Sequence, residues 1–196
     1  GETLYHTVHD VLQKLETTVS SLTEATDRPQ GKLRVTTTVG LGTGWLTTRI
    51  HEFLELFPEV QLELILTDEE LDLATRQADC AIRLRQPQQA DIIQRKLFTV
   101  HFHLYAAPIY VKRNGQPKNL EELDDHKILT FGESAPAYLA DTNWLKTAGR
   151  PDNNPRTPVC EANNMVALRK ITEGGAGIAV LPDYIVDHSH ALLPLM

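Results

Sequence analysis

Hydrophobic residues recur at two different spacings along this chain, and each spacing predicts a different kind of element. In the first segment the apolar residues Leu4, Val8, Val11 and Leu15 lie three or four residues apart, and Leu22 continues the pattern seven residues later, with Thr18 between. This spacing gives an apolar seam along one face of a helix, which we expect over residues 1–28. Because such a seam is buried best against a second helix, we expect this segment to link and dimerise the chain.

From residue 31 onward, short runs rich in β-branched residues alternate with helical patterns. We expect strands at 33–38, 60–66 and 80–84, with helices at 45–57 and 69–77 between them. Helices that separate short apolar strands are typical of parallel sheets, because a parallel pair needs a crossover connection. This half of the chain therefore predicts a first α/β lobe, residues 31–104.

A long extended segment, residues 92–108, is expected to cross into a second lobe, residues 105–196. Beyond it the alternation resumes, with helices expected at 120–123 and 163–174 and strands at 127–131, around Trp144, and at 157–162, 177–181 and 191–196. The fold class is therefore α/β, with two Rossmann-like lobes joined by a hinge. Ligands of such sheets bind beyond the carboxyl ends of the strands, so we expect a site in a cleft between the lobes.

Composition and charge exclude several classes of function. The chain has 196 residues, 41% of them hydrophobic, and a net charge of −7 that argues against direct binding to DNA or an acidic membrane. With no run of about eighteen apolar residues and no secretion signal pattern, a cytoplasmic location is expected. Cys80 and Cys160 lie far apart without a metal-ligand pattern, so we expect two buried thiols and no metal or cofactor.

Five stretches, in order, resemble LysR-type transcriptional regulators. They are residues 1–22, similar to the family's linker helix; 31–64, similar to the start of its effector-binding domain; and 78–84, 104–110 and 161–186. The resemblance implies two lobes of the type II periplasmic-binding-protein kind, a small-molecule effector, and a homodimer or homotetramer. It also implies DNA binding through an N-terminal winged helix-turn-helix. Neither that domain nor the family's C-terminal strand and helix is in this sequence, so we expect a piece of a longer protein.

Polar residues at the end of the first strand are the leading candidates for effector contact. Thr36, Thr37 and Thr38 follow the apolar Leu33 to Val35, and with Val39 they match the strand end that faces the effector in the family. The first amides of the following helix lack intrahelical partners, which favours an anionic ligand. Threonines also cap helices and suit strands, which would explain one or two of them without a ligand.

Arginine and asparagine side chains are expected to complete the site. Arg83 and Arg85 leave a strand end, where a guanidinium could pair with an anion, although a surface ion pair explains them equally well. Asn163, Asn164 and Met165 open a helix of the second lobe, and one asparagine is expected to be its N-cap.

Two further candidates, Pro108 and Phe131, have weaker grounds. Pro108 could fix the direction of the crossover, and Phe131 could provide an aromatic wall. The more ordinary interpretation makes them a turn residue and a core residue.

Two other classes of function stay open. A transport-type solute-binding protein shares the two-lobed plan, but it should carry a secretion signal and needs no dimerisation helix. An enzyme would need a catalytic constellation, and the histidine pairs 101/103 and 188/190 lie in no known catalytic motif. The sequence therefore favours a non-catalytic regulator that senses a small, anionic metabolite.

Overall fold

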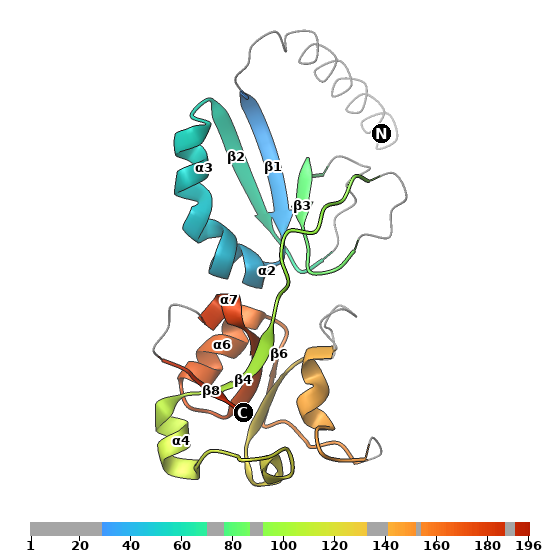
Figure 1. Ribbon diagram of the computed structural model, residues 1–196, viewed down its shortest axis with the longest axis vertical. Coiled ribbons are helices and arrows are strands. Elements are labelled where there is room, and N and C mark those ends of the chain that lie inside the picture. The colour runs from blue at the N-terminus through green and yellow to red at the C-terminus, as the bar shows by residue number, and fades with distance from the viewer. Residues whose placement is uncertain (1–28, 70–76, 87–91, 133–140, 152–153, 187–190) are drawn as a thin grey trace, which may run out of the picture.

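The computed structural model describes residues 29–69, 77–86, 92–132, 141–151, 154–186 and 191–196. They form two β-sheets, one above the other in Figure 1, with helices beside each. We call the part around the first sheet, residues 29–86, lobe I, and the part around the second, residues 102–196, lobe II. The expected helix 1–28 and helix 69–77 lie outside the described residues, apart from Glu69 and Gln77.

Lobe I is a parallel sheet of the order β2-β1-β3, as its sequence pattern predicts. Its strands are β1 (Gly31–Thr37), β2 (Val60–Leu66) and β3 (Cys80–Ile82). β1 lies in the middle, so its residues are the most enclosed, and burial increases from the exposed Gly31 to the buried Thr37. The carboxyl ends of all three strands point toward lobe II (Figure 1).

A continuous helical segment connects β1 to β2. It comprises α2 (Val39–Leu41), the π-helical η1 (Gly42–Leu46), the 3-10 turn η2 (Thr47–Arg49) and α3 (Ile50–Leu56). Thr38 begins it as N-cap, because its Oγ1 accepts a hydrogen bond from the amide of Leu41 at 3.3 Å. The helix therefore starts earlier than the expected 45–57, and the glycines at 40, 42 and 44 lie within it.

Residues 92–101 run from lobe I into lobe II, as the extended pattern predicts (Figure 1). Lobe II is a mixed sheet of the order β6-β5-β7-β4-β8. Its strands are β4 (Phe102–Ala106), β5 (Ile128–Phe131), β6 (Cys160–Ala162), β7 (Ile178–Pro182) and β8 (Leu193–Leu195). β5, β6 and β7 are parallel, whereas β4 runs antiparallel to β7 and β8.

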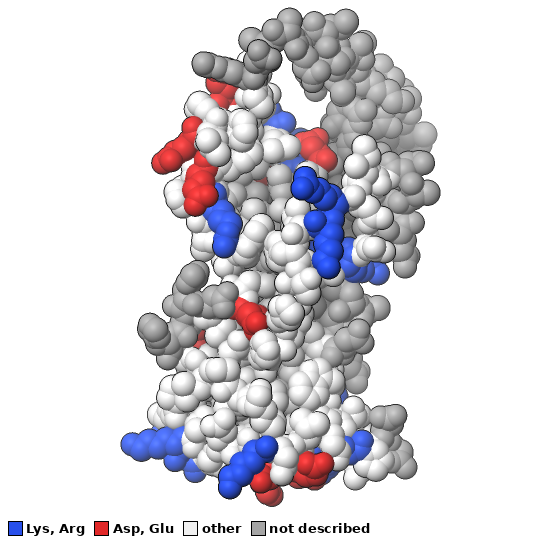
Figure 2. Space-filling view, viewed as in Figure 1, with Lys and Arg blue, Asp and Glu red and all other residues white. Residues whose placement is uncertain are grey.

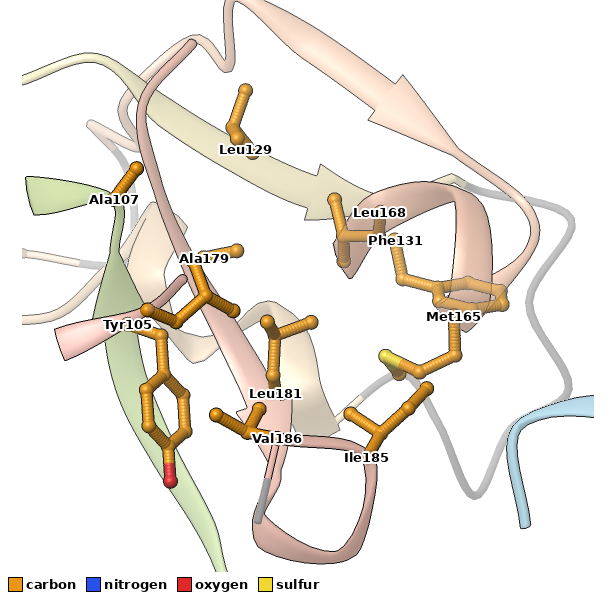
Figure 3. Packing of buried hydrophobic residues seen from close by; sticks show 11 residues of the cluster. Tyr105, Ala107, Leu129, Phe131, Met165, Leu168, Ala179, Leu181, Ile185 and Val186 are labelled. Carbon is orange, nitrogen blue, oxygen red and sulfur yellow. The ribbon is translucent and has the colours of Figure 1, made fainter. Parts of the chain in front are cut away.

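Several helical elements accompany this sheet: α4 (Pro108–Asn114), η3 (Glu121–Asp125), η4 (Asp141–Lys146), α6 (Met165–Glu173) and α7 (Asp183–Val186). They cover two apolar clusters. One lies between the sheet and α6 and α7 and includes Phe131, Met165 and Leu168 (Figure 3). The other includes Tyr110, Leu123 and Leu145.

Two expectations about local structure are wrong. The residues around Trp144 form the 3-10 helix η4 rather than a strand, and this turn buries Leu145 while Trp144 stays partly exposed. Cys80 is exposed because it opens the edge strand β3, so the expected pair of buried thiols is not observed. Within the described ranges, no helix combines the length and apolar character needed to cross a membrane.

Candidate functional site

The carboxyl ends of the lobe I strands are held together by an arginine. Arg83, directly after β3, donates from one terminal nitrogen to the carbonyl of Thr67 and from the other to Thr36 Oγ1, each at 2.9 Å. Thr36 Oγ1 in turn donates to the carbonyl of Ile65 at 3.1 Å. Arg83 and Thr36 therefore tie the ends of β1, β2 and β3 to one another, which gives both residues a structural task.

The three threonines, equivalent in the sequence, have different environments. Thr36 is paired as described, and Thr38 caps α2. Thr37 is 0% exposed, and its hydroxyl has no hydrogen-bond partner among the described residues. A buried hydroxyl without a partner is destabilising, so Thr37 is the threonine whose presence the fold itself does not explain.

A carboxylate already occupies the start of the lobe I helix. Asp68 Oδ1 accepts a hydrogen bond from the amide of Val39 at 3.1 Å. This bond and the cap from Thr38 satisfy the amides of Val39 and Leu41, two of the donors that the sequence assigned to an anion. Neither amide is therefore open to a further partner in this arrangement.

The start of α6 faces this strand end from lobe II. Asn164 is the N-cap, with its Oδ1 accepting from the amides of Val166 and Ala167 at 3.0 Å each, whereas Asn163 is exposed. Met165 is buried and lies against α2, since a Cβ built on Gly40 would be 3.2 Å from Met165 Cβ. The structure therefore brings Thr38 and Val39 near Asn164 and Met165, and identifies Asn164 as the structural asparagine of the pair.

Other expected site residues have more varied positions. Arg85 is half-buried, and Leu84 beside it packs against the apolar core of lobe II, so residues 83–85 lie where the lobes meet. Phe131 is 1% exposed and packs in the core next to Met165 (Figure 3), so it supports the site from beneath and offers no open aromatic wall.

Pro108 is not brought together with the other candidates. It is the first residue of α4, at the far end of β4 from lobe I (Figure 1). Its fixed φ suits the first helical position, which gives it the ordinary turn role.

Three glycines near the site have a role that the sequence pattern alone does not assign to them. Gly40 and Gly44 lie against α6 and α7 of lobe II, and Gly42 lies against Leu66 and Thr37. Their spacing of four, with the third glycine between them, is a signal in the sequence for a helix with two closely packed faces. The three glycines therefore lie in a closely packed helix.

Of the histidines that raised the question of catalysis, His101 and His103 are described, whereas His188 and His190 lie outside the described residues. His103 Nδ1 and the Tyr105 hydroxyl contact Asp183 Oδ1 at 2.6 and 2.9 Å, and His101 is exposed. Within the described ranges, His, Cys, Asp and Glu do not gather into groups of three or more that could hold a metal ion. Figure 2 shows mostly uncharged residues around the junction of the lobes, with charged side chains on lobe I and at the far end of lobe II.

Comparison with known proteins identifies relatives. The model of the LysR substrate binding domain matches residues 26–195. An HTH-type transcriptional regulator of Xanthomonas campestris pv. campestris is 29% identical over 174 residues, which cover 88% of this chain and 51% of that protein. The HTH-type transcriptional regulator CrgA of Neisseria meningitidis serogroup C is 29% identical over 199 residues, 100% of this chain and 65% of that protein. The chain thus spans about half to just under two-thirds of these relatives.

Solved structures agree with these relatives. The CrgA regulatory domain from Neisseria meningitidis, a LysR-type transcriptional regulator, has a TM-score of 0.73 and 30% identity, and the match covers 85% of this chain and 81% of that one. The full-length Vibrio cholerae virulence activator AphB, at 21% identity and a TM-score of 0.66, covers 100% of this chain and 66% of that one and shares the fold. These matches confirm the two-lobed α/β fold and favour a regulatory domain over an enzyme.

Proposed function

The chain belongs to the LysR substrate binding domain family, and from this membership we propose that it senses a small anionic metabolite where its two lobes meet. The ligand would contact Thr37, Thr38 and Val39 on lobe I, with Arg83 and Arg85 beside them, and Asn163, Asn164 and Met165 on lobe II. In the whole protein, this event would regulate binding to DNA by a domain outside this chain. A cytoplasmic homodimer or homotetramer, joined through residues 1–28, is part of the same proposal.

The observation that carries this proposal is the unpartnered hydroxyl of Thr37. Among the described residues it has no hydrogen-bond partner, and it is buried at the carboxyl end of the central strand, the position where ligands of parallel sheets bind. A ligand group that accepts or donates one hydrogen bond would remove the cost of leaving this hydroxyl unpaired. A purely structural residue at this position would be expected to be valine, which has nearly the same shape.

The expected charge of the ligand rests on the two arginines. Arg83 and Arg85 place two positive charges near the strand ends, and Asp68 places one negative charge there. A compact carboxylate suits such side chains, because a guanidinium binds a carboxylate through parallel hydrogen bonds.

Signalling requires that the ligand prefer one arrangement of the lobes. The Thr37 hydroxyl is covered in the described arrangement, so a ligand that bonds to it selects an arrangement in which this strand end is reachable. To shift almost all molecules from one arrangement of the lobes to the other, the ligand must bind the second arrangement more tightly by on the order of 5 kcal/mol. Residues 1–28 would carry that change to the DNA-binding domains.

Thermal-shift measurements with a defined panel of compounds test the proposal. The panel contains benzoate, acetate, malate and succinate, each with its neutral amide, and the proteins are the parent chain, Thr37→Val and Thr43→Val. Thr43 is a matched control, because it is exposed and its hydroxyl bonds to the carbonyl of Val39 in its own helix. We expect a carboxylate to raise the melting temperature of the parent and of Thr43→Val, and to have a much smaller effect on Thr37→Val.

Two results would contradict parts of the proposal. If the compound that stabilises the parent stabilises Thr37→Val equally, the site has been placed wrongly. If the amide stabilises as well as the carboxylate, the ligand need not be anionic.

A further inference from the structure

One contact between the two lobes is made by two glycines on one face of a lobe I helix. Gly40 and Gly44 are four residues apart in the helical segment α2–η1, so they lie on the same face. A Cβ on Gly40 would be 3.2 Å from Met165 Cβ and 3.4 Å from the Tyr184 hydroxyl. We call the contact of Gly40 and Gly44 with Met165, Tyr184 and Ile185 the glycine seam.

At Gly44 the partner is backbone, which cannot move aside as a side chain can. A Cβ there would be 3.2 Å from Ile185 Cα, 3.2 Å from the Tyr184 carbonyl oxygen and 3.2 Å from Tyr184 Cδ2. All three distances are shorter than an ordinary van der Waals contact between such atoms. A methyl group at this position would therefore have to displace the backbone of α7 or the lobe I helix by a few tenths of an ångström.

α7 is firmly attached to lobe II, so lobe II cannot easily adapt. Asp183, its first residue, donates its amide to the carbonyl of His101 at 3.0 Å. The carboxylate of Asp183 is bound by His103 and by the Tyr105 hydroxyl, both on β4. Ile185 and Val186 complete the attachment, since both are buried in the lobe II core (Figure 3).

The opposite face of the same helix is equally closely packed. Gly42 lies over the end of β1 and β2, where a Cβ would meet Thr37 Cγ2 at 3.0 Å and would overlap Leu66 Cδ2. The helix is therefore enclosed between its own sheet and lobe II. A displacement at the seam would therefore press the helix against the side chains of Leu66 and Thr37 at the end of the sheet.

We propose that the glycine seam sets the arrangement of the two lobes and is the surface on which they move relative to each other. Thr38 and Val39 directly precede Gly40, and Asn163 and Asn164 directly precede Met165. The seam therefore also fixes the distance across the candidate effector site, a consequence that rests on the proposed function. Any shift between the lobes changes the seam and that distance together.

The test measures the distance between the lobes in the absence of ligand. Nitroxide labels are placed at Glu52→Cys on α3 and Lys112→Cys on α4, both exposed, in a Cys80→Ser, Cys160→Ser background. Double electron–electron resonance then compares the parent with Gly44→Ala, Gly40→Ala and Gly132→Ala. Gly132 is the matched control, because a Cβ there would have its nearest neighbour at 3.8 Å, an ordinary contact.

We expect Gly44→Ala to shift or broaden the distance distribution, Gly40→Ala to do so less, and Gly132→Ala to leave it unchanged. Melting temperatures give a second readout. Alanine has a higher helix propensity than glycine, so Gly44→Ala would raise the melting temperature if nothing packed against Gly44. Because α7 packs there, we expect Gly44→Ala to lower the melting temperature. If Gly44→Ala does not fold, Gly40→Ala carries the same comparison.

Unchanged distances in both seam variants would overturn the proposal, as would an equal shift in Gly132→Ala. Because no ligand is used, these outcomes are independent of whether a carboxylate binds at Thr37. A failed ligand screen together with a shifted distance would leave the seam established and the effector site misplaced.

Discussion

Lobe I and lobe II bury different kinds of side chain. Among the described residues, lobe II encloses both apolar clusters, and every residue of β5 and β7 is buried. In lobe I, no residue of α3 is fully buried, and Leu56 is 73% exposed. The fully enclosed side chains of lobe I include Thr36 and Thr37, at the edge that meets lobe II.

This difference indicates that the lobes obtain their order from different interactions. Apolar burial contributes free energy without demanding a particular geometry, so lobe II is expected to be the stable platform. The end of β1 instead depends on hydrogen bonds from Arg83, and the helix that follows it contacts lobe II. A region ordered by a few directional contacts can adopt a second arrangement at low cost, which is what a sensor requires.

The largest expected effect comes from removing the aromatic ring at the centre of the lobe II core. Phe131→Ala leaves a cavity among Met165, Leu168 and their neighbours, so we expect a loss of about 3–5 kcal/mol in the free energy of unfolding. Urea denaturation followed by circular dichroism measures it. Ile93→Ala, at a fully exposed position, is the control and should change stability by less than about 0.5 kcal/mol. A loss below about 1 kcal/mol in Phe131→Ala would contradict the role of lobe II as platform.

A buried arginine provides the second prediction. Arg156 is 6% exposed and donates to Asp124 and to the carbonyls of Leu145, Ala148 and Leu120. Arg156→Met removes these donors, and we expect a loss of about 2–3 kcal/mol from the unpaired carbonyls, measured by urea unfolding. Arg169→Met is the control, because Arg169 makes an i,i+4 pair with Glu173 that contributes only about 0.5 kcal/mol or less. Equal losses of unfolding free energy in the two variants would mean that the buried hydrogen bonds of Arg156 contribute no more than the i,i+4 pair of Arg169.

Acid titration of stability checks this cluster independently. A hydrogen bond from Arg150, assisted by one from Arg156, holds the pKa of Asp124 below its ordinary value despite the opposing effect of burial. A carboxylate with a lowered pKa stabilises the folded state above its ordinary pKa, and this contribution is lost as the pH falls through the lowered value. The parent should therefore lose stability over that acid window, and Asp124→Asn should lose less. Equal acid sensitivity of the two proteins would show that Arg150 and Arg156 do not lower the pKa of Asp124.

The sequence predicted the elements well wherever periodicity alone determines them. β2 is observed at residues 60–66, where it is expected, because apolar and polar residues alternate along this segment and such alternation predicts a strand. The strand expected around Trp144 is wrong, since a short apolar run does not distinguish a strand from a 3-10 turn. The glycine seam could not be predicted, because which helix face meets lobe II is decided by tertiary packing.

The same limit applies within the candidate site. Alternation along β1 implies that Thr36 and Thr37 point to opposite faces, but not which of them meets Arg83. The sequence therefore indicates this strand end but cannot separate a structural threonine from one whose hydroxyl lacks a partner among the described residues. It also gives no indication that Asp68 occupies the helix start.

Matched substitutions of these two threonines give the next prediction, in lobe I. Thr36→Val removes the acceptor of Arg83 and the donor to Ile65, so we expect a loss of about 1–2 kcal/mol. Thr37→Val removes a buried hydroxyl that has no partner among the described residues, so we expect no loss, or a gain of up to about 1 kcal/mol. Thermal and urea unfolding of the two variants in parallel measure the difference. Equal losses in both would mean that the two hydroxyls are equally bonded in solution, and the contrast within lobe I would disappear.

The smallest expected effect separates the two asparagines at the start of α6, the lobe II side of the site. Asn164 caps the helix through two amides, so Asn164→Ala should lower the free energy of unfolding by about 1 kcal/mol, measured by urea denaturation. Asn163 is exposed, and Asn163→Ala should change stability by less than about 0.5 kcal/mol. Asn164→Asp serves as a second control, because aspartate caps as well as asparagine and should restore most of the loss. If Asn163→Ala were the more destabilising change, the assignment of the cap would be wrong, and Asn164 rather than Asn163 would be the better candidate for contact with a ligand.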